Sequence, residues 1–120
     1  MALTIYERAG GFASVRKIVS SFYDKALESE LIAHHFEHIE MPRLIDHQTR
    51  FISFLMGGPA SYTDEHIEHV HARLGITLAE FDEMVELLTE TLEDFDFGSD
   101  DVAKIGQELR KREPVIVTGR

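Results

Sequence analysis

Apolar residues recur at intervals of three and four along most of the chain, which is the spacing of one face of an α-helix. The pattern predicts a short helix over residues 4–9 and a longer one over residues 12–29. The apolar face of the longer helix consists of Val15, Ile18, Val19, Phe22, Ala26 and Leu27. Two glycines at 10–11 separate the two helices, and residues 30–40 predict a short, irregular helical connection.

Residues that start and stop helices divide the middle of the chain. Pro42 suits the first turn of a helix, which we expect to extend to Met56 and to end at the GGP sequence of residues 57–59. Thr63 or Asp64 then caps a short helix that ends near Gly75.

The last third of the chain begins with a capping-box pattern. In such a box the Thr77 hydroxyl accepts a backbone N–H of the first helical turn, and the Glu80 side chain accepts the Thr77 backbone N–H. The helix that follows has one apolar stripe, made of Phe81, Met84, Val85, Leu88 and Leu92. A final helix is expected from Ser99 to about Arg112, with Pro114 and a short polar tail after it. No segment has the length and alternation of a convincing strand, so the sequence predicts an all-α fold.

Composition narrows the class of protein. The chain has 120 residues, which predicts one domain over residues 1–120, and its formal net charge is −10. An acidic chain argues against nucleic-acid and anionic-membrane binding, since both need a basic face. Cysteine is absent, no apolar run approaches the length of a membrane span, and no signal-peptide pattern is present. We therefore expect a soluble, cytoplasmic protein.

One helical face in the middle of the chain carries polar residues in an apolar setting. Its members recur at spacings of three and four and are Leu44, His47, Gln48, Phe51 and Leu55. A buried amide without a partner costs about 1–3 kcal/mol. Gln48 is therefore either a core residue bonded to a neighbouring helix, with His47 at the surface edge, or a residue that faces a pocket.

Tyr23 and the histidines allow similar alternatives. Tyr23 lies on an apolar helix face, where a core residue with a bonded hydroxyl is the simpler interpretation. His34 and His38 have the i, i+4 spacing of a zinc pair, but no motif supplies a third ligand, and solvated histidines are the simpler interpretation. The chain also lacks a phosphate-binding loop and a serine nucleophile elbow.

A series of short motifs, taken in order along the chain, resembles the group I truncated haemoglobins. The motifs are YERAGG at 6–11, SFYDKAL at 21–27, Phe36, HQTRF at 47–51, LMGGPASYT at 55–63 and HARLGIT at 71–77. Each is weak alone, but their order and spacing extend over about residues 4–112. The resemblance implies a truncated globin fold, a two-over-two helical sandwich around haem b.

The resemblance also implies roles for individual residues. His71 is similar to the proximal histidine that ligates the iron, and Phe36 to the phenylalanine stacked on the porphyrin. Tyr23 and Gln48 resemble the distal groups that stabilise a bound gas. The further haem contacts that the resemblance implies are Leu44, Ile76, Phe81, Met84 and Leu88, with Arg43 and Arg73 as candidates for the propionates.

Two more histidines bear on the iron. His69 competes with His71 for the proximal position, but two residues along a helix correspond to about 200° around its axis, so the two side chains cannot face the same plane. The family pattern selects His71, whose second ring nitrogen then needs an acceptor, and the nearest is a carbonyl one turn back, around Ile67. His47 resembles the residue that ligates iron in some members when no gas is bound, so we expect a six-coordinate resting state with His47 and His71.

Three hypotheses for the function remain open, of which the first two rest on the resemblance. The first is nitric oxide dioxygenation on a haem that binds O2, NO and CO. This activity would depend on an unidentified external reductase. The second is reversible oxygen storage or transport, or gas sensing, without catalysis. The third is a helical interaction domain that binds no haem. A monomer is expected in each case.

Overall fold

The computed structural model describes residues 3–119, which fold into helices with no strand among them. The α-helices are α1 Ile5–Ala9, α2 Phe12–Glu28, α3 Met41–Leu55, α4 Asp64–His71, α5 Leu78–Asp94, α6 Ser99–Arg110 and α7 Glu113–Ile116. A 3-10 helix, η1, covers Ala33–Phe36. The predicted all-α class is confirmed, and no helix within residues 3–119 is long and apolar enough to cross a membrane.

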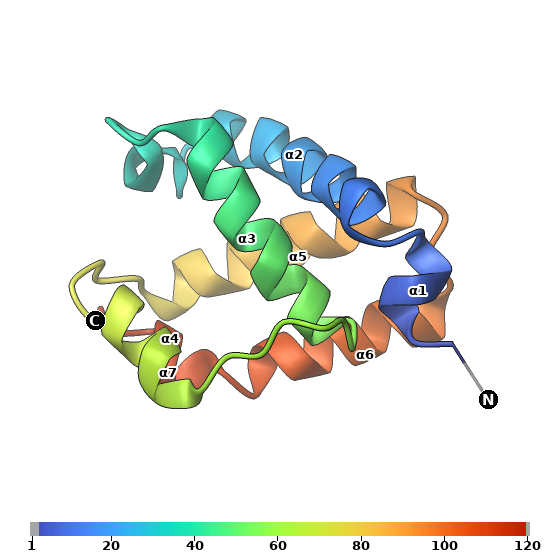
Figure 1. The fold of residues 1–120 in the computed structure, drawn as a ribbon. Helices are drawn as coiled ribbons and strands as arrows, with labels where there is room; N and C mark the ends of the chain where they lie inside the picture. Colours follow the sequence, from blue (N-terminus) through green and yellow to red (C-terminus); the bar gives the residue numbers. More distant parts are fainter. Residues whose placement is uncertain (1–2, 120) are drawn as a thin grey trace.

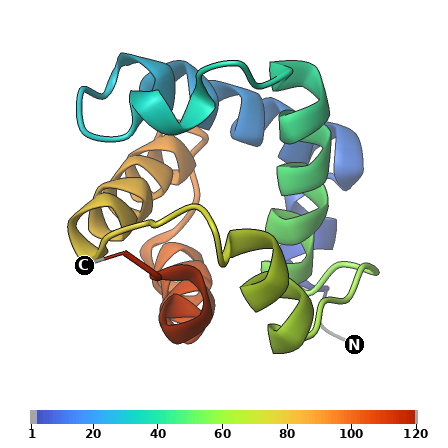
Figure 2. The same ribbon diagram turned by 90° about the vertical axis from the view of Figure 1, so that its left-hand side faces the viewer.

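Two pairs of long helices form the body of the molecule. Helices α2 and α3 cross in one layer, α5 and α6 form the other, and α2 also packs on α5 (Figure 1). The view at right angles shows the two layers from one end, with α4 and α7 next to each other along one edge (Figure 2). This is the predicted two-over-two arrangement.

Side-chain caps define the start of several helices. Thr4 and Glu7 form a capping box at α1, in which the Glu7 N–H donates to Thr4 Oγ1 at 3.0 Å and the Thr4 N–H donates to Glu7 Oε1 at 3.1 Å. The predicted box at α5 is present as well, with Thr77 as the N-cap. Pro42 lies in the first turn of α3, where its missing N–H leaves no bond unmade.

Paired glycines end α3 as predicted. Gly57 has φ of +84°, a left-handed conformation that a side chain disfavours. The Gly58 N–H donates to the Ser53 carbonyl at 2.7 Å, and a Cβ at Gly58 would lie 3.0 Å from the Tyr6 ring. The glycines therefore turn the chain sharply and let α1 lie against the end of α3.

The core lies between the layers and uses the predicted apolar faces, with one exception. Val15, Ile18, Val19, Phe22 and Ala26 of α2 are all buried. Leu27 was predicted on the same face but is 45% exposed. That prediction is wrong, because periodicity places a residue around the helix but does not say where the covering helices stop.

The predicted polar tail after Pro114 is wrong. Residues 113–116 form α7, which packs against α4, and Ile116 is only 5% exposed. Beyond it, the N–H groups of Thr118 and Gly119 both donate to the Ile76 carbonyl, at 3.0 and 2.9 Å. A four-residue helix is too short to show periodicity, so its burial follows from contact with α4 rather than from its own pattern.

The helix before Gly75 is also shorter than predicted. Helix α4 ends at His71, and the chain then turns, with the Leu74 N–H donating to the His71 carbonyl at 3.0 Å. His71 is therefore the last helical residue of α4, next to the turn that leads into α5.

Candidate functional site

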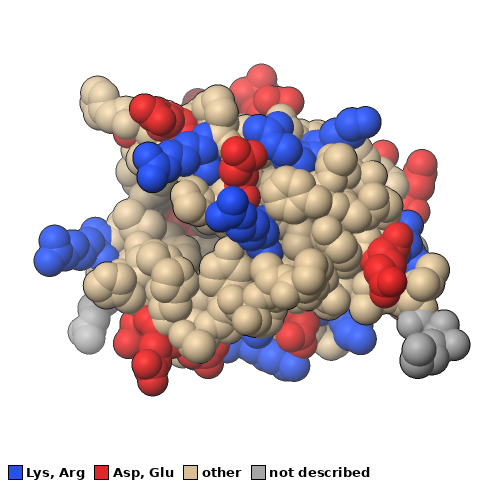
Figure 3. Space-filling view, viewed as in Figure 1, with Lys and Arg blue, Asp and Glu red and all other residues tan. Residues whose placement is uncertain are grey.

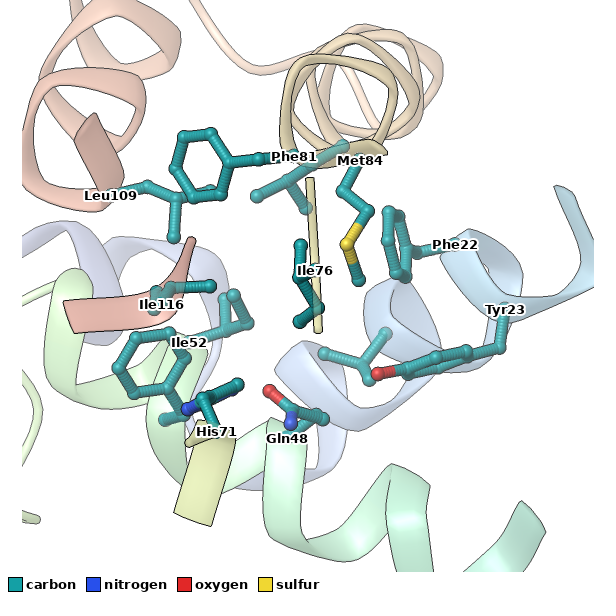
Figure 4. Close-up of a pocket in the computed structure, with 13 residues that line it drawn as sticks. Phe22, Tyr23, Gln48, Ile52, His71, Ile76, Phe81, Met84, Leu109 and Ile116 are labelled. Atoms are coloured by element: carbon teal, nitrogen blue, oxygen red, sulfur yellow. The ribbon is translucent and has the colours of Figure 1, made fainter. Parts of the chain in front are cut away.

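A cavity of about 80 Å³ lies between the two layers. The residues around it come from α2, α3, α4, α5, α6, α7 and the α4–α5 connection, and Figure 4 shows them facing one space. Ten of its lining residues are apolar: Val19, Phe22, Phe51, Ile52, Ile76, Phe81, Met84, Leu88, Leu109 and Ile116. Only Tyr23, Gln48 and His71 bring polar groups to the lining.

His71 lies on the α4 side of this cavity and is held by its own helix. Its Nδ1 lies 2.7 Å from the Ile67 carbonyl oxygen, the acceptor expected from the sequence. A carbonyl can only accept, so Nδ1 carries the proton and Nε2 keeps its lone pair. Burial lowers the pKa of His71, although the bond to Ile67 opposes that shift. The imidazole is therefore neutral near pH 7, which is the form that binds iron.

Tyr23 and Gln48 bring two hydrogen-bonding side chains to the same cavity from α2 and α3. Tyr23 is 3% exposed, and burial raises the pKa of its hydroxyl, so the group stays protonated. Figure 4 shows the Tyr23 hydroxyl and the Gln48 amide directed toward the same part of the cavity. Within residues 3–119 neither side chain hydrogen-bonds to a protein group, so the alternative of a core glutamine tied to a neighbouring helix is not observed.

Phe36 and Leu44 are not among the residues that line the cavity. Both are partly buried against the core. The Phe36 ring meets the Tyr23 ring edge to face, with centroids 5.3 Å apart and an interplanar angle of 87°. Phe36 thereby supports the ring that carries the buried hydroxyl, and the predicted haem contacts of Phe36 and Leu44 stay predictions.

His47, Arg43 and Arg73 are exposed, and the structure does not bring them to the cavity. His47 precedes Gln48 on α3, and neighbouring helical residues point about 100° apart, so only one of them faces inward. Neither Arg43 nor Arg73 forms an ion pair within the described part of the chain. Their roles as iron ligand and propionate partners stay predictions.

Six lining residues were not among the predicted site residues: Val19, Phe22, Phe51, Ile52, Leu109 and Ile116. Val19, Phe22 and Phe51 were predicted on apolar helix faces, but not as part of the site. Leu109 follows Val102 and Ile105 at helical spacing, so periodicity indicated a buried position but not which cavity it would meet. Ile116 lies in α7, which the sequence did not predict.

The surface next to the cavity mixes both signs of charge. Figure 3 shows basic and acidic side chains interspersed along this face, with a hollow beside α3. One of the pairs on the α2–α3 layer is Arg16 with Asp46, at 2.7 Å. This pattern fits a small ligand that enters an apolar interior better than a polyanion laid across the surface.

The donor set fits haem. The site offers an imidazole nitrogen without a bound proton, an apolar lining and two donors that have no protein partner in the described part of the chain. Proteins hold and tune haem iron in such surroundings.

Known proteins share this sequence and this fold. The group 1 truncated haemoglobin of Tetrahymena pyriformis is 32% identical over 111 residues, which cover 90% of this chain and 92% of the relative. A crystal structure of a mutant of the Tetrahymena pyriformis truncated haemoglobin, in its Fe(III) form, superposes with a TM-score of 0.87 at 25% identity and covers 98% of this chain and 100% of the other.

A third similarity concerns the fold alone. The 2/2 haemoglobin of a Synechococcus species, in the cyanomet state with covalently attached haem, gives a TM-score of 0.86 at 24% identity over 96% of this chain and 98% of the other. The family model of bacterial-like globins matches residues 4–114. This chain therefore belongs to the bacterial-like globin family, among the group 1 truncated haemoglobins, and membership implies that it binds haem and small gases such as dioxygen.

Proposed function

We propose that haem b occupies the cavity, with His71 as the proximal iron ligand and Tyr23 and Gln48 on the distal side. One observation carries the proposal. A histidine whose Nδ1 is hydrogen-bonded to the Ile67 carbonyl shares an apolar cavity with two donors that have no protein partner among residues 3–119. The apolar contacts of the porphyrin in this proposal are Phe36, Leu44, Ile76, Phe81, Met84 and Leu88. When bound, haem supplies a one-electron redox centre that takes up O2, NO and CO.

The activity we propose is nitric oxide dioxygenation. The overall reaction would combine dioxygen, nitric oxide and one electron into nitrate; bound haem would supply that electron, and a separate reductase would return it for each turnover. The chain contributes position and exclusion of water. Tyr23 and Gln48 donate hydrogen bonds to the bound gas, and such bonds are stronger in an apolar, low-dielectric cavity.

Rapid mixing of the oxygenated protein with nitric oxide tests the activity. We expect one nitrate for each haem, formed within the first milliseconds, and a slower reaction in Tyr23→Phe. Slow or substoichiometric nitrate would instead support reversible oxygen storage, transport or sensing, in which the gas complex is long-lived. Nitrate formed by free haem under the same conditions is the control.

We also propose a six-coordinate resting state, for which His47 and His71 would both ligate the iron. His47 is exposed in the structure and adjacent in sequence to the cavity-lining Gln48, so ligation requires α3 to shift or turn toward the cavity. The visible spectrum of the reduced, gas-free protein then shows low-spin iron and becomes high-spin in His47→Ala. A high-spin spectrum that His47→Ala leaves unchanged contradicts the proposal.

The remaining features of the proposal concern the whole molecule. We propose a monomeric, cytoplasmic protein with one domain over residues 1–120. Arg43 and Arg73 pair with the haem propionates in this proposal, and both guanidinium groups are exposed and without an ion pair within residues 3–119. Replacing either arginine with alanine is expected to speed haem transfer to an acceptor protein, and gel filtration reports the oligomeric state.

A further inference from the structure

A second cluster of ligating side chains lies outside the cavity, where η1 meets the first turn of α5. It consists of His34, His35 and Glu80, and one ligand atom from each lies within 4.8 Å of the others. His35 Nε2 is 2.9 Å from Glu80 Oε2, and His34 Nε2 is 3.2 Å from the same oxygen. The geometry points to a binding site for a divalent transition cation of the zinc type, separate from the haem cavity.

Two of the three separations between the ligand atoms are already close to the spacing that a zinc ion requires, and the third is within 4.8 Å. Zinc in proteins is tetrahedral with nitrogen and oxygen ligands at about 2.0–2.2 Å, so neighbouring ligand atoms lie roughly 3.3 Å apart. The two histidine–carboxylate distances are close to that spacing. The imidazole rings of His34 and His35 lie beside each other, with centroids 4.1 Å apart and a tilt of 36°. Two imidazoles and one carboxylate leave a fourth position for water.

Glu80 is held for this role by its second oxygen. Oε1 accepts the Thr77 backbone N–H at 2.9 Å as part of the α5 capping box, which leaves Oε2 to the two imidazoles. Burial alone raises the pKa of Glu80, but its bonds to Thr77 and His35 outweigh burial and hold the pKa below its usual value. The carboxylate is therefore ionised at neutral pH and fixed by a neighbouring group, as metal-ligating carboxylates are.

The cluster is open on one side. The Glu80 and His35 side chains are largely covered, whereas the His34 side chain is 56% exposed. A cation can therefore reach the site from solvent, and His34 can move to complete the ligand set. η1 and the start of α5 lie at the same end of the molecule in Figure 1.

The pair indicated by spacing alone is a different one. His34 and His38 are four residues apart, but η1 ends at Phe36 and His38 has φ of +64°, so no α-helix places the two rings on one face. His38 is absent from the cluster. It therefore offers a matched control, and His38→Asn suits the left-handed backbone there.

Calorimetric titration of the haem-loaded protein with zinc chloride, with bound zinc counted after equilibrium dialysis, tests the site. We expect one zinc ion for each chain. His34→Gln and Glu80→Gln should each weaken binding by at least about 10- to 100-fold, since even residues that only orient a metal ligand cost that much. His38→Asn should bind as tightly as the unaltered chain.

Two results would overturn the proposal. The first is the absence of a one-to-one zinc complex in the unaltered protein. The second is unchanged affinity in both His34→Gln and Glu80→Gln. Glu80→Gln keeps a side-chain oxygen for the helix cap. If Glu80→Gln still impairs folding, His34→Gln gives the same test, because His34 is exposed and the core is unaltered. Imidazole nitrogen NMR adds a direct readout. Zinc should shift Nε2 of His34 and His35 and leave unshifted His66, an exposed residue of α4 that is not part of the cluster.

Discussion

Histidines occupy two contrasting settings in this molecule, the cavity wall at His71 and the surface cluster of His34 and His35. His71 bonds to an uncharged backbone carbonyl and faces apolar side chains. The cluster imidazoles share one carboxylate oxygen, and His34 faces solvent. The comparison shows that the hydrogen-bond partner and the solvent exposure of a histidine decide what it can bind. A neutral ring in an apolar cavity suits haem iron, whereas a carboxylate beside two imidazoles suits a free cation.

The largest effect is expected from removing the cavity histidine. His71→Ala should abolish the axial anchor, so the Soret band of the haem-supplied protein should fall or move to that of loosely held haem. His69→Ala is the matched control, since His69 is exposed on the same helix and should leave the spectrum unaltered. A native-like spectrum in His71→Ala would show that the proximal assignment is wrong. Zinc binding at the cluster should be the same in both variants.

A second experiment asks whether the cavity depends on α7. Ile116→Ala removes buried side-chain volume from the wall, and such changes cost about 2–5 kcal/mol in the free energy of unfolding. Urea unfolding of the haem-loaded protein measures that loss. Val115→Ala, on the same short helix but only partly buried, should cost less. Equal losses in the two variants would mean that Ile116 has no special place in the wall.

A smaller effect is expected from the two donors. In the proposed site, Tyr23→Phe and Gln48→Leu should each remove one hydrogen bond to the bound gas. The loss of about 1–1.5 kcal/mol corresponds to roughly a tenfold faster release of oxygen. Laser photolysis or stopped-flow displacement by CO measures the rate. Arg50→Gln, an exposed change on α3, is the control. If both variants release oxygen at the original rate, Tyr23 and Gln48 do not contact the gas.

The smallest effect is expected from removing zinc. The two sites share no ligand, so a chelator such as EDTA should strip the cluster and leave the Soret band and the oxygen release rate unaltered. A change in either quantity would show that the sites are coupled. Phe36 is the residue through which such coupling would pass, because it follows His35 in sequence and its ring contacts the Tyr23 ring.

The long helices were predictable because each carries several turns of apolar periodicity between recognisable caps. Gln48 could be singled out for the same reason, as an amide on an apolar face. Tyr23 could not, since a buried tyrosine is ordinary, and only the family resemblance separated its role from that of a core residue. The choice of His71 over His69 also depended on the resemblance.

What the sequence could not predict depends on contacts between distant segments. Ile116 becomes a wall residue only because α4 covers α7. His35 and Glu80 lie 45 positions apart, so no spacing rule joins them, and the nearby pair His34 and His38 was the misleading alternative. Local sequence patterns therefore predict the helices and their buried faces. A site built from several helices depends on how those helices pack, which local patterns do not show.

The bonds from Thr118 and Gly119 to Ile76 have a consequence for how the protein matures in the cell. Chains emerge from the ribosome starting at the N-terminus, so His71 and the α5 wall are exposed to the cellular environment before Leu109 and Ile116 exist. Until residues 113–119 have been made, the cavity lacks part of its wall. It also lacks the hydrogen bonds from Thr118 and Gly119 that join the end of the chain to the α4–α5 connection. In the proposed function, we therefore expect stable capture of haem to follow translation of this segment.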